Sequence, residues 1–91
     1  MGYNVYFVEL SQRSQNYLDK LDKHIRERIE KRLKNLGSKP VPKDSKFMGR
    51  VGGDSVFRYR IGDYRALYKI KEEEKIVLVA KIDKRPRIYK R

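Results

Sequence analysis

Apolar residues between Ser11 and Leu36 recur at helical spacing. Ser11 suits an N-cap, because its hydroxyl can accept a hydrogen bond from a free helical N–H, and Gly37 suits a helix end. A run of about 25 residues is long for one globular helix, so we expect a break at Asp19–Asp22 and an antiparallel helix pair. The apolar stripe consists of Leu18, Leu21, Ile25, Ile29, Leu33 and Leu36.

Strand-like patterns flank the helical region. Tyr3–Leu10 is rich in aromatic and β-branched residues, and the proline-containing segment Ser38–Ser45 reads as a linker. The breaks after it are short, so the strands that follow should form an antiparallel meander. The continuous apolar run Val77–Ala80 suits a central strand covered on both faces. The four strands of the meander are expected at Lys46–Val51, Val56–Ile61, Arg65–Ile70 and Ile76–Ile82.

The predicted fold is therefore α+β, in a single domain that spans residues 1–91. An N-terminal strand comes first, two antiparallel helices follow, and a four-stranded antiparallel meander completes the chain. We expect the helices to pack on one face of this sheet.

Charge changes this picture, because the chain carries 24 Lys and Arg against 12 Asp and Glu, a net charge of +12. Residues 38–91 hold a net +9 and residues 1–37 only +3. An excess of this size favours an anionic partner, above all a nucleic acid. Arg58 and Arg60 alternate with the hydrophobic residues Phe57, Tyr59 and Ile61, so the arginines should share one face. Neighbouring basic residues then predict one concave basic face, with Tyr64 and Tyr89 near it.

Several kinds of site are excluded or disfavoured by composition. The chain has no cysteine and a single histidine, His24, which we expect to be a surface or boundary residue of a helix and not a catalyst. No metal site and no cofactor are predicted. No apolar run approaches the roughly 20 residues that span a membrane, and no signal peptide is visible. We therefore expect a cytoplasmic protein with no membrane partner.

A family resemblance rests on the second half of the chain. The segment Arg58–Tyr68 reads Arg-Tyr-Arg-Ile-Gly-Asp-Tyr-Arg-Ala-Leu-Tyr and resembles the basic-x-basic-x-Gly-Asp-Tyr-Arg-x-x-Tyr core of RelE-type toxins of the RelE/ParE superfamily. Lys46–Gly49 resembles the short segment that opens their sheet. Ile76–Ile82, followed by Asp83-Lys84-Arg85, resembles their last strand and the Gly-His/Lys-Arg that follows it, and Tyr89 matches a tyrosine slightly further on.

The resemblance implies a ribosome-dependent mRNA endonuclease that cuts messenger RNA in the ribosomal A site, through attack of a ribose 2′-OH on the adjacent phosphate. Because the composition offers no divalent metal site, we expect this cleavage to be metal-independent. Its expected partners are the messenger, the ribosome and a small acidic RelB-like antitoxin. Carried over by position, the catalytic residues would be Arg58, Arg60, Arg65, Arg85 and Tyr89. The expected RNA- and ribosome-binding residues are Lys46, Arg50, Lys81, Lys84, Arg87 and Lys90.

Two points stay open at this stage. Many members of the family have lysine where this chain has Arg58 and Arg60, and arginine stays protonated, so the general base is unassigned. Lys84 and a phosphate-activated water are the alternatives. The function also has alternatives: a ParE-like toxin that inhibits DNA gyrase without cutting RNA, or a plain RNA- or ribosome-binding protein.

Overall fold

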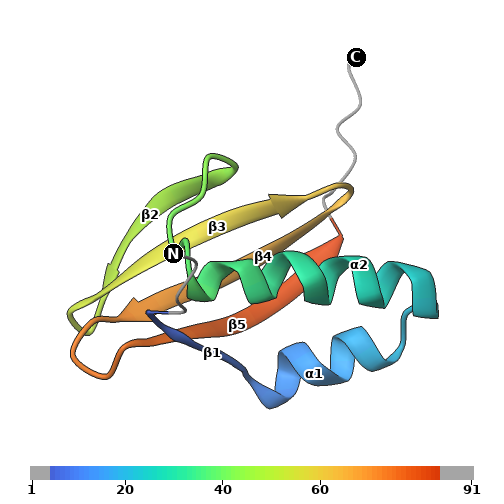
Figure 1. Ribbon diagram of the computed structural model, residues 1–91, viewed down its shortest axis with the longest axis horizontal. Coiled ribbons are helices and arrows are strands. Elements are labelled where there is room, and N and C mark those ends of the chain that lie inside the picture. Colours follow the sequence, from blue (N-terminus) through green and yellow to red (C-terminus); the bar gives the residue numbers. More distant parts are fainter. Residues whose placement is uncertain (1–4, 85–91) are drawn as a thin grey trace.

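The computed structural model describes residues 5–84, which include two helices that run in opposite directions (Figure 1). Helix α1 spans Gln12–Asp19 and α2 spans Lys23–Lys34, followed by the short 3-10 helix η1 at Asn35–Gly37. The expected break at Asp19–Asp22 is confirmed. Ser11 caps α1 as expected, because its Oγ accepts a hydrogen bond from the backbone N–H of Ser14 at 3.1 Å.

Five strands form one mixed sheet in the order β1-β5-β4-β3-β2 (Figure 1). Strands β2 to β5 are antiparallel neighbours, which confirms the meander. The strands are β1 (Phe7–Leu10), β2 (Ser45–Val51), β3 (Asp54–Ile61), β4 (Tyr64–Lys71) and β5 (Ile76–Lys84).

The expectation of a four-stranded sheet was incomplete, because β1 joins the same sheet as a fifth strand. It lies parallel to β5, with Val8 opposite Val77 and Leu10 opposite Val79. On its apolar side, Val8 and Leu10 are half-buried and pack against the core. The strand is also shorter than the predicted Tyr3–Leu10: it begins at Phe7, and Tyr3 lies outside the described residues.

The core lies between the helices and one face of the sheet. Leu18, Ile29 and Leu33 from the helices are buried against alternate residues of β3, β4 and β5.

The expectation that Val77–Ala80 is covered on both faces was wrong. Val77 and Val79 are buried, but Leu78 and Ala80 are only half-buried, since helices cover one face of the sheet alone. Over residues 5–84, no helix covers the second face, which we call the open face.

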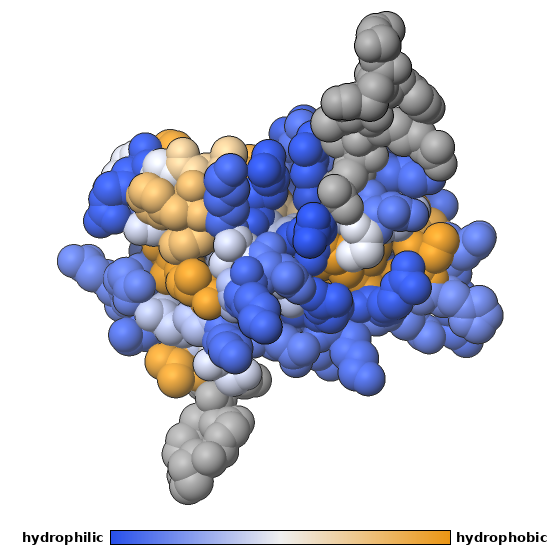
Figure 2. Space-filling model, turned by 90° about the horizontal axis from the view of Figure 1, so that it is seen from above, coloured by the Kyte–Doolittle hydropathy of each residue, from blue (hydrophilic) through white to orange (hydrophobic). Residues whose placement is uncertain are grey.

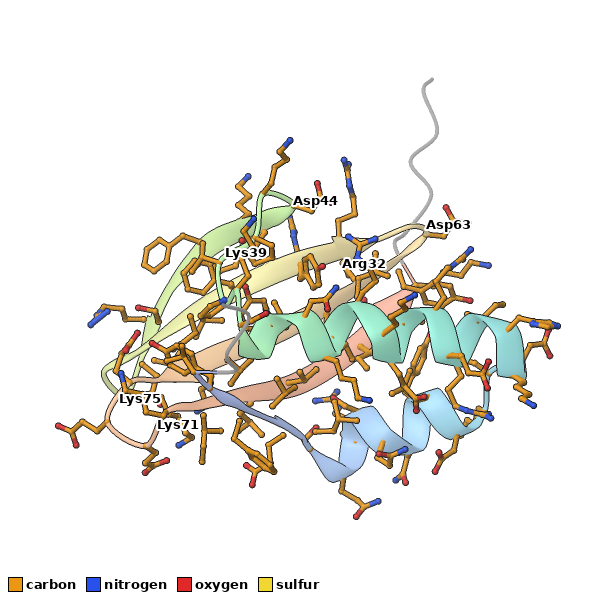
Figure 3. The ribbon with its side chains drawn as sticks, viewed as in Figure 1. Arg32, Lys39, Asp44, Asp63, Lys71 and Lys75 are labelled. Carbon is orange, nitrogen blue, oxygen red and sulfur yellow. The ribbon has the colours of Figure 1, made fainter. Side chains whose placement is uncertain are left out.

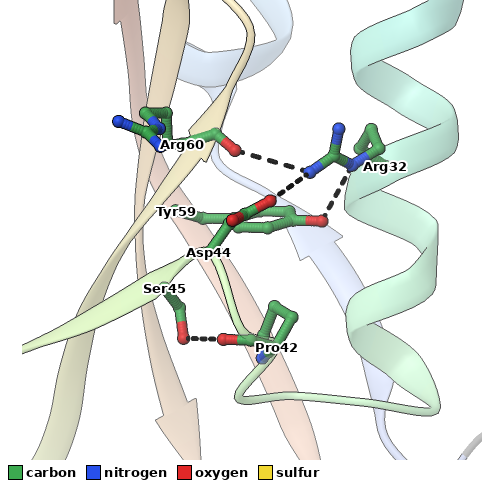
Figure 4. Close-up of polar contacts among 6 residues, drawn as sticks. All are labelled: Arg32, Pro42, Asp44, Ser45, Tyr59 and Arg60. Carbon is green, nitrogen blue, oxygen red and sulfur yellow. Dashed lines mark hydrogen bonds and ion pairs between the residues drawn. The ribbon is translucent and has the colours of Figure 1, made fainter.

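Arg32 of α2 fixes the position of β3 relative to the helices (Figures 3 and 4). Its Nε donates to the hydroxyl of Tyr59 at 3.0 Å, and its guanidinium lies 5.2 Å from the centre of that ring. One Nη also donates to Asp44 at 3.2 Å and to the carbonyl oxygen of Arg60 at 3.5 Å. The hydrogen bond to Tyr59 raises the pKa of Arg32 above the usual value of an arginine. With Tyr59 held on the helix side, strand alternation turns Arg58 and Arg60 to the open face.

Over residues 5–84, no helix is long and apolar enough to cross a membrane.

Candidate nucleic-acid interface

Basic side chains from three neighbouring strands meet on the open face of the sheet. Phe57, Tyr59 and Ile61 are buried, whereas Arg58 is half-buried and Arg60 is exposed, so the predicted alternation along β3 is confirmed. The strand register then brings in basic residues from β4 and β5. Arg60 lies directly opposite Arg65, Arg58 opposite Leu67, and Leu67 opposite Lys81.

A hollow of about 200 Å³ lies at the centre of these residues, and we call it the basic hollow. Three cations and one carboxylate line it, so its charge is net positive. The carboxylate is Asp83, which accepts a hydrogen bond from Arg65 Nε at 3.0 Å and lies 3.6 Å from Lys81 Nζ. Arg65 and Asp83 each keep about a third of their side-chain surface exposed. The lining residues are Met48, Arg58, Arg65, Leu67, Lys81 and Asp83.

The two predicted binding residues of β2 are separated onto opposite faces. Lys46 lies opposite Arg58 and shares its open face. Arg50 instead lies opposite Ser55 and donates to its hydroxyl at 2.8 Å, on the other face. A β-bulge between Phe47 and Gly49 causes the switch, since the extra residue reverses the alternation. Gly49 has a φ of +134°, which favours glycine at this point.

The prediction that Tyr64 lies near the basic face was wrong. Its side chain is buried on the helix side, where its ring packs edge-on against Tyr17 of α1 with 6.5 Å between ring centres. Lys84 lies opposite Tyr64 in the register, so it shares the helix side of the sheet, and its side chain is exposed. Lys84 is therefore placed away from the basic hollow.

Four of the predicted site residues lie outside the described residues, so their place relative to the hollow stays a prediction. They are Arg85, Arg87, Tyr89 and Lys90.

Three residues of the hollow were missed as site residues. Met48 is brought to it by the bulge, and Leu67 by its register between Arg58 and Lys81. Asp83 had been read only as part of the motif that follows the last strand. A simple alternation argument could have found Asp83, because it is two positions from Lys81 on the same strand.

Within residues 5–84, no group of three or more His, Cys, Asp or Glu side chains is placed to hold a metal ion.

Comparison with known proteins identifies the family. Residues 8–89 match the model of the family described as the ParE toxin of the type II toxin–antitoxin system parDE. The chain belongs to this family of toxins. It is also 30% identical, over 84 residues, to a Methanocaldococcus jannaschii protein named as toxin RelE1, and the match covers 91% of this chain and 93% of that protein. These matches place the toxin in the RelE/ParE superfamily.

Solved structures of RelE toxins share the fold of this toxin. A chain of the archaeal RelE–RelB complex from Pyrococcus horikoshii matches with a TM-score of 0.83 and 26% identity, over 92% of this chain and 99% of that one. A chain of the RelBE2 toxin–antitoxin complex from Mycobacterium tuberculosis matches with a TM-score of 0.74 and 27% identity, over 88% and 98%. The E. coli RelBE complex gives 0.70 and 26%, over 90% and 99%. The α+β fold with two helices and a mixed sheet is thus common to these toxins.

Proposed function

We propose that this toxin is a ribosome-dependent endoribonuclease that cuts messenger RNA by attack of a ribose 2′-OH on the adjacent phosphate. The observation that carries the proposal is the basic hollow, where Arg58, Arg65 and Lys81 come from three different strands to one site. Arg60 and Lys46 flank it on the same face. Cations fixed on strands around one small hollow suit a transition state that gains negative charge.

The chemistry divides between binding and charge stabilisation. Guanidinium groups bind phosphate oxygens in a bidentate manner, which would orient the scissile phosphate in the hollow. The pentacovalent transition state carries more negative charge than the substrate, so the same cations stabilise it more strongly. Arginine stays protonated at neutral pH, so Arg58 and Arg65 would bind the phosphate and would not remove the 2′-hydroxyl proton.

Inhibition of DNA gyrase without RNA cleavage is the second candidate function. It is favoured by one observation, that the matching family model is that of ParE toxins. The cluster of cations in the basic hollow argues for the nuclease, since binding a protein partner does not need several cations directed at one small hollow.

The deciding experiment adds the purified toxin to ribosomes programmed with a defined messenger. We expect cleavage of the messenger on the ribosome, products with a 5′-hydroxyl and a 2′,3′-cyclic or 3′-phosphate, and activity that survives EDTA when a polyamine maintains the ribosomes. Products with a 5′-phosphate would overturn 2′-OH attack. Loss of gyrase supercoiling with the messenger intact would assign the toxin to the second function.

We also propose that a small acidic RelB-like antitoxin neutralises this toxin. The support is the net charge of +12 together with the solved RelE–RelB complexes of relatives. A groove of about 430 Å³ between β1 and α2 offers an apolar floor of Val8, Leu10 and Leu33. Figure 2 shows a second hydrophobic patch, at the sheet edge formed by β2, where Phe47, Met48 and Val51 are exposed. An amphipathic acidic chain that wraps the toxin would cover both.

Affinity capture at rising salt tests this partner. We expect an acidic protein to be retained, with affinity that falls as salt screens the charges but does not vanish, because apolar surface is buried as well. A basic partner would contradict the proposal.

A further inference from the structure

The basic hollow contains one negative charge, and its position is unusual for a phosphate site. Asp83 lies directly opposite Arg65 in the β4–β5 register and two positions from Lys81 on β5. Both of its carboxylate oxygens are engaged, Oδ1 by Arg65 Nε at 3.0 Å and Oδ2 by Lys81 Nζ at 3.6 Å. A carboxylate here repels a phosphate, so its presence needs a compensating role.

The geometry of the contact with Arg65 indicates that role. Asp83 accepts from Nε, which is the donor on the inner side of the guanidinium. A bond at Nε fixes the rotation of the planar group and leaves the Nη donors for a bidentate contact. The guanidinium is therefore held in place before any phosphate arrives, and electrostatic stabilisation of a transition state depends on such preorganisation.

The charge has a second consequence for binding. Asp83 neutralises part of the charge of Arg65 and Lys81, so the hollow attracts polyanions less strongly than three unpaired cations would. Tight binding that is equal for substrate and transition state does not speed the chemical step. A carboxylate that orients one guanidinium would raise the rate of cleavage, and it would lower the affinity for RNA in general.

We propose that Asp83 is a positioning residue, which orients Arg65 and Lys81 toward the scissile phosphate and restrains non-productive binding of RNA. This inference rests on the proposed nuclease function. It predicts a split between two measurements: removal of the carboxylate charge should tighten RNA binding and slow cleavage at the same time. A residue that only stabilises the fold would not produce this split.

The experiment compares the wild type with Asp83→Asn in two assays. In single-turnover cleavage on programmed ribosomes at saturating toxin, we expect Asp83→Asn to be slower by about tenfold, since one donor is mispositioned but not removed. In fluorescence anisotropy with a single-stranded RNA oligonucleotide, we expect tighter binding. We also expect the plot of log binding constant against log salt concentration to be steeper by about 0.7, which is the value for one additional cation paired with phosphate.

Asp54→Asn is the matched control, because Asp54 lies on the same face and also faces two cations, Lys69 at 4.0 Å and Lys71 at 3.9 Å, outside the basic hollow. This variant should bind RNA more tightly but cleave at the wild-type rate at saturation. Asp83→Glu keeps the charge and should return the affinity to that of the wild type. Thermal unfolding of each variant shows whether the fold is retained.

Two results would overturn the role of Asp83: a wild-type cleavage rate for Asp83→Asn at saturation, or a slower rate accompanied by weaker RNA binding. Failure of the proposed nuclease is distinguishable, because the wild type itself would then leave the messenger intact. The anisotropy assay would still decide whether Asp83 weakens RNA binding by the cations of the hollow. An unchanged affinity of Asp83→Asn for RNA would reject that effect.

Discussion

Arg60 of β3 and Arg65 of β4 lie directly opposite each other in an antiparallel pair. Like charges in this position destabilise a sheet, because the two side chains start only about 5 Å apart. Arg65 has Asp83 as an ion-pair partner on its other side, whereas Arg60 is exposed at the edge of the hollow. The fold therefore carries a local electrostatic cost at the place where the proposed function needs positive charge.

Replacing Arg60 with glutamine should reveal this cost. We expect Arg60→Gln to raise the free energy of unfolding by about 0.5 kcal/mol at low salt, since the repulsion with Arg65 is removed. The gain should disappear at high salt, where exposed charges are screened. Urea denaturation at two salt concentrations measures both values, with Lys23→Gln on α2 as the control for a lost charge elsewhere. Lower stability of Arg60→Gln at both salt concentrations would show that the arginine pair is not repulsive.

Arg65→Ala should separate function from stability. If Arg65 contacts the scissile phosphate, its loss should slow single-turnover cleavage by about a hundredfold, or about 3 kcal/mol. The fold should persist, because a partly exposed ion pair contributes little to stability. Circular dichroism beside the cleavage assay distinguishes the two effects, and Lys23→Ala serves as the matched control. A variant that cuts at the wild-type rate would place the site elsewhere, and one that unfolds would make Arg65 structural.

The helices and the meander could be predicted because their patterns are local. The stripe of apolar residues from Leu18 to Leu36 and the alternation along β3 each depend on neighbouring positions in the chain. The pairing of β1 with β5 could not be read in this way. It joins residues about 70 positions apart, and no local pattern in the sequence predicts which edge strand of the sheet β1 will pair with.

The errors at the site have physical causes of two kinds. Alternation counted from Lys46 would place Arg50 on the same face, but the bulge before Gly49 inserts a residue and moves Arg50 to the other side. The misplacement of Tyr64 was avoidable, since a residue adjacent to Arg65 on a strand must point to the opposite face. The tail from Arg85 onward lies outside the described residues, so the roles predicted for it stay untested.

The contact of Arg32 with Tyr59 should stabilise the fold by a measurable coupling. Arg32→Ala removes a hydrogen bond of 3.0 Å and a cation–π contact that together join α2 to β3. A double-mutant cycle with Tyr59→Phe should give a coupling energy of about 1 kcal/mol. Asp44→Ala removes only an exposed ion pair with Arg32 and should change the unfolding free energy by less than about 0.5 kcal/mol. Additive effects of Arg32→Ala and Tyr59→Phe would show that the contact contributes nothing.

Tyr68 should make the toxin less stable in alkaline solution. It is fully buried, stacks on Phe57 with 5.6 Å between ring centres, and donates its hydroxyl hydrogen to the Pro40 carbonyl oxygen at 2.5 Å. Burial raises its pKa from 10.0 to about 12. The unfolded chain therefore loses this proton at lower pH than the folded one. The associated stability is complete below pH 10.0, falls as the pH rises, and is lost above about pH 12.

The difference between the wild type and Tyr68→Phe isolates this effect from the many lysines that titrate in the same range. Two pKa units correspond to about 3 kcal/mol, so the wild type should lose about that much stability relative to Tyr68→Phe between pH 10.0 and about 12. Phenylalanine keeps the ring but loses the hydrogen bond to Pro40, so Tyr68→Phe should start less stable by about 1 kcal/mol at neutral pH. The two curves should then cross as the pH rises. Curves that stay parallel in urea denaturation would show that the Tyr68 hydroxyl ionises as readily in the folded toxin as in the unfolded chain.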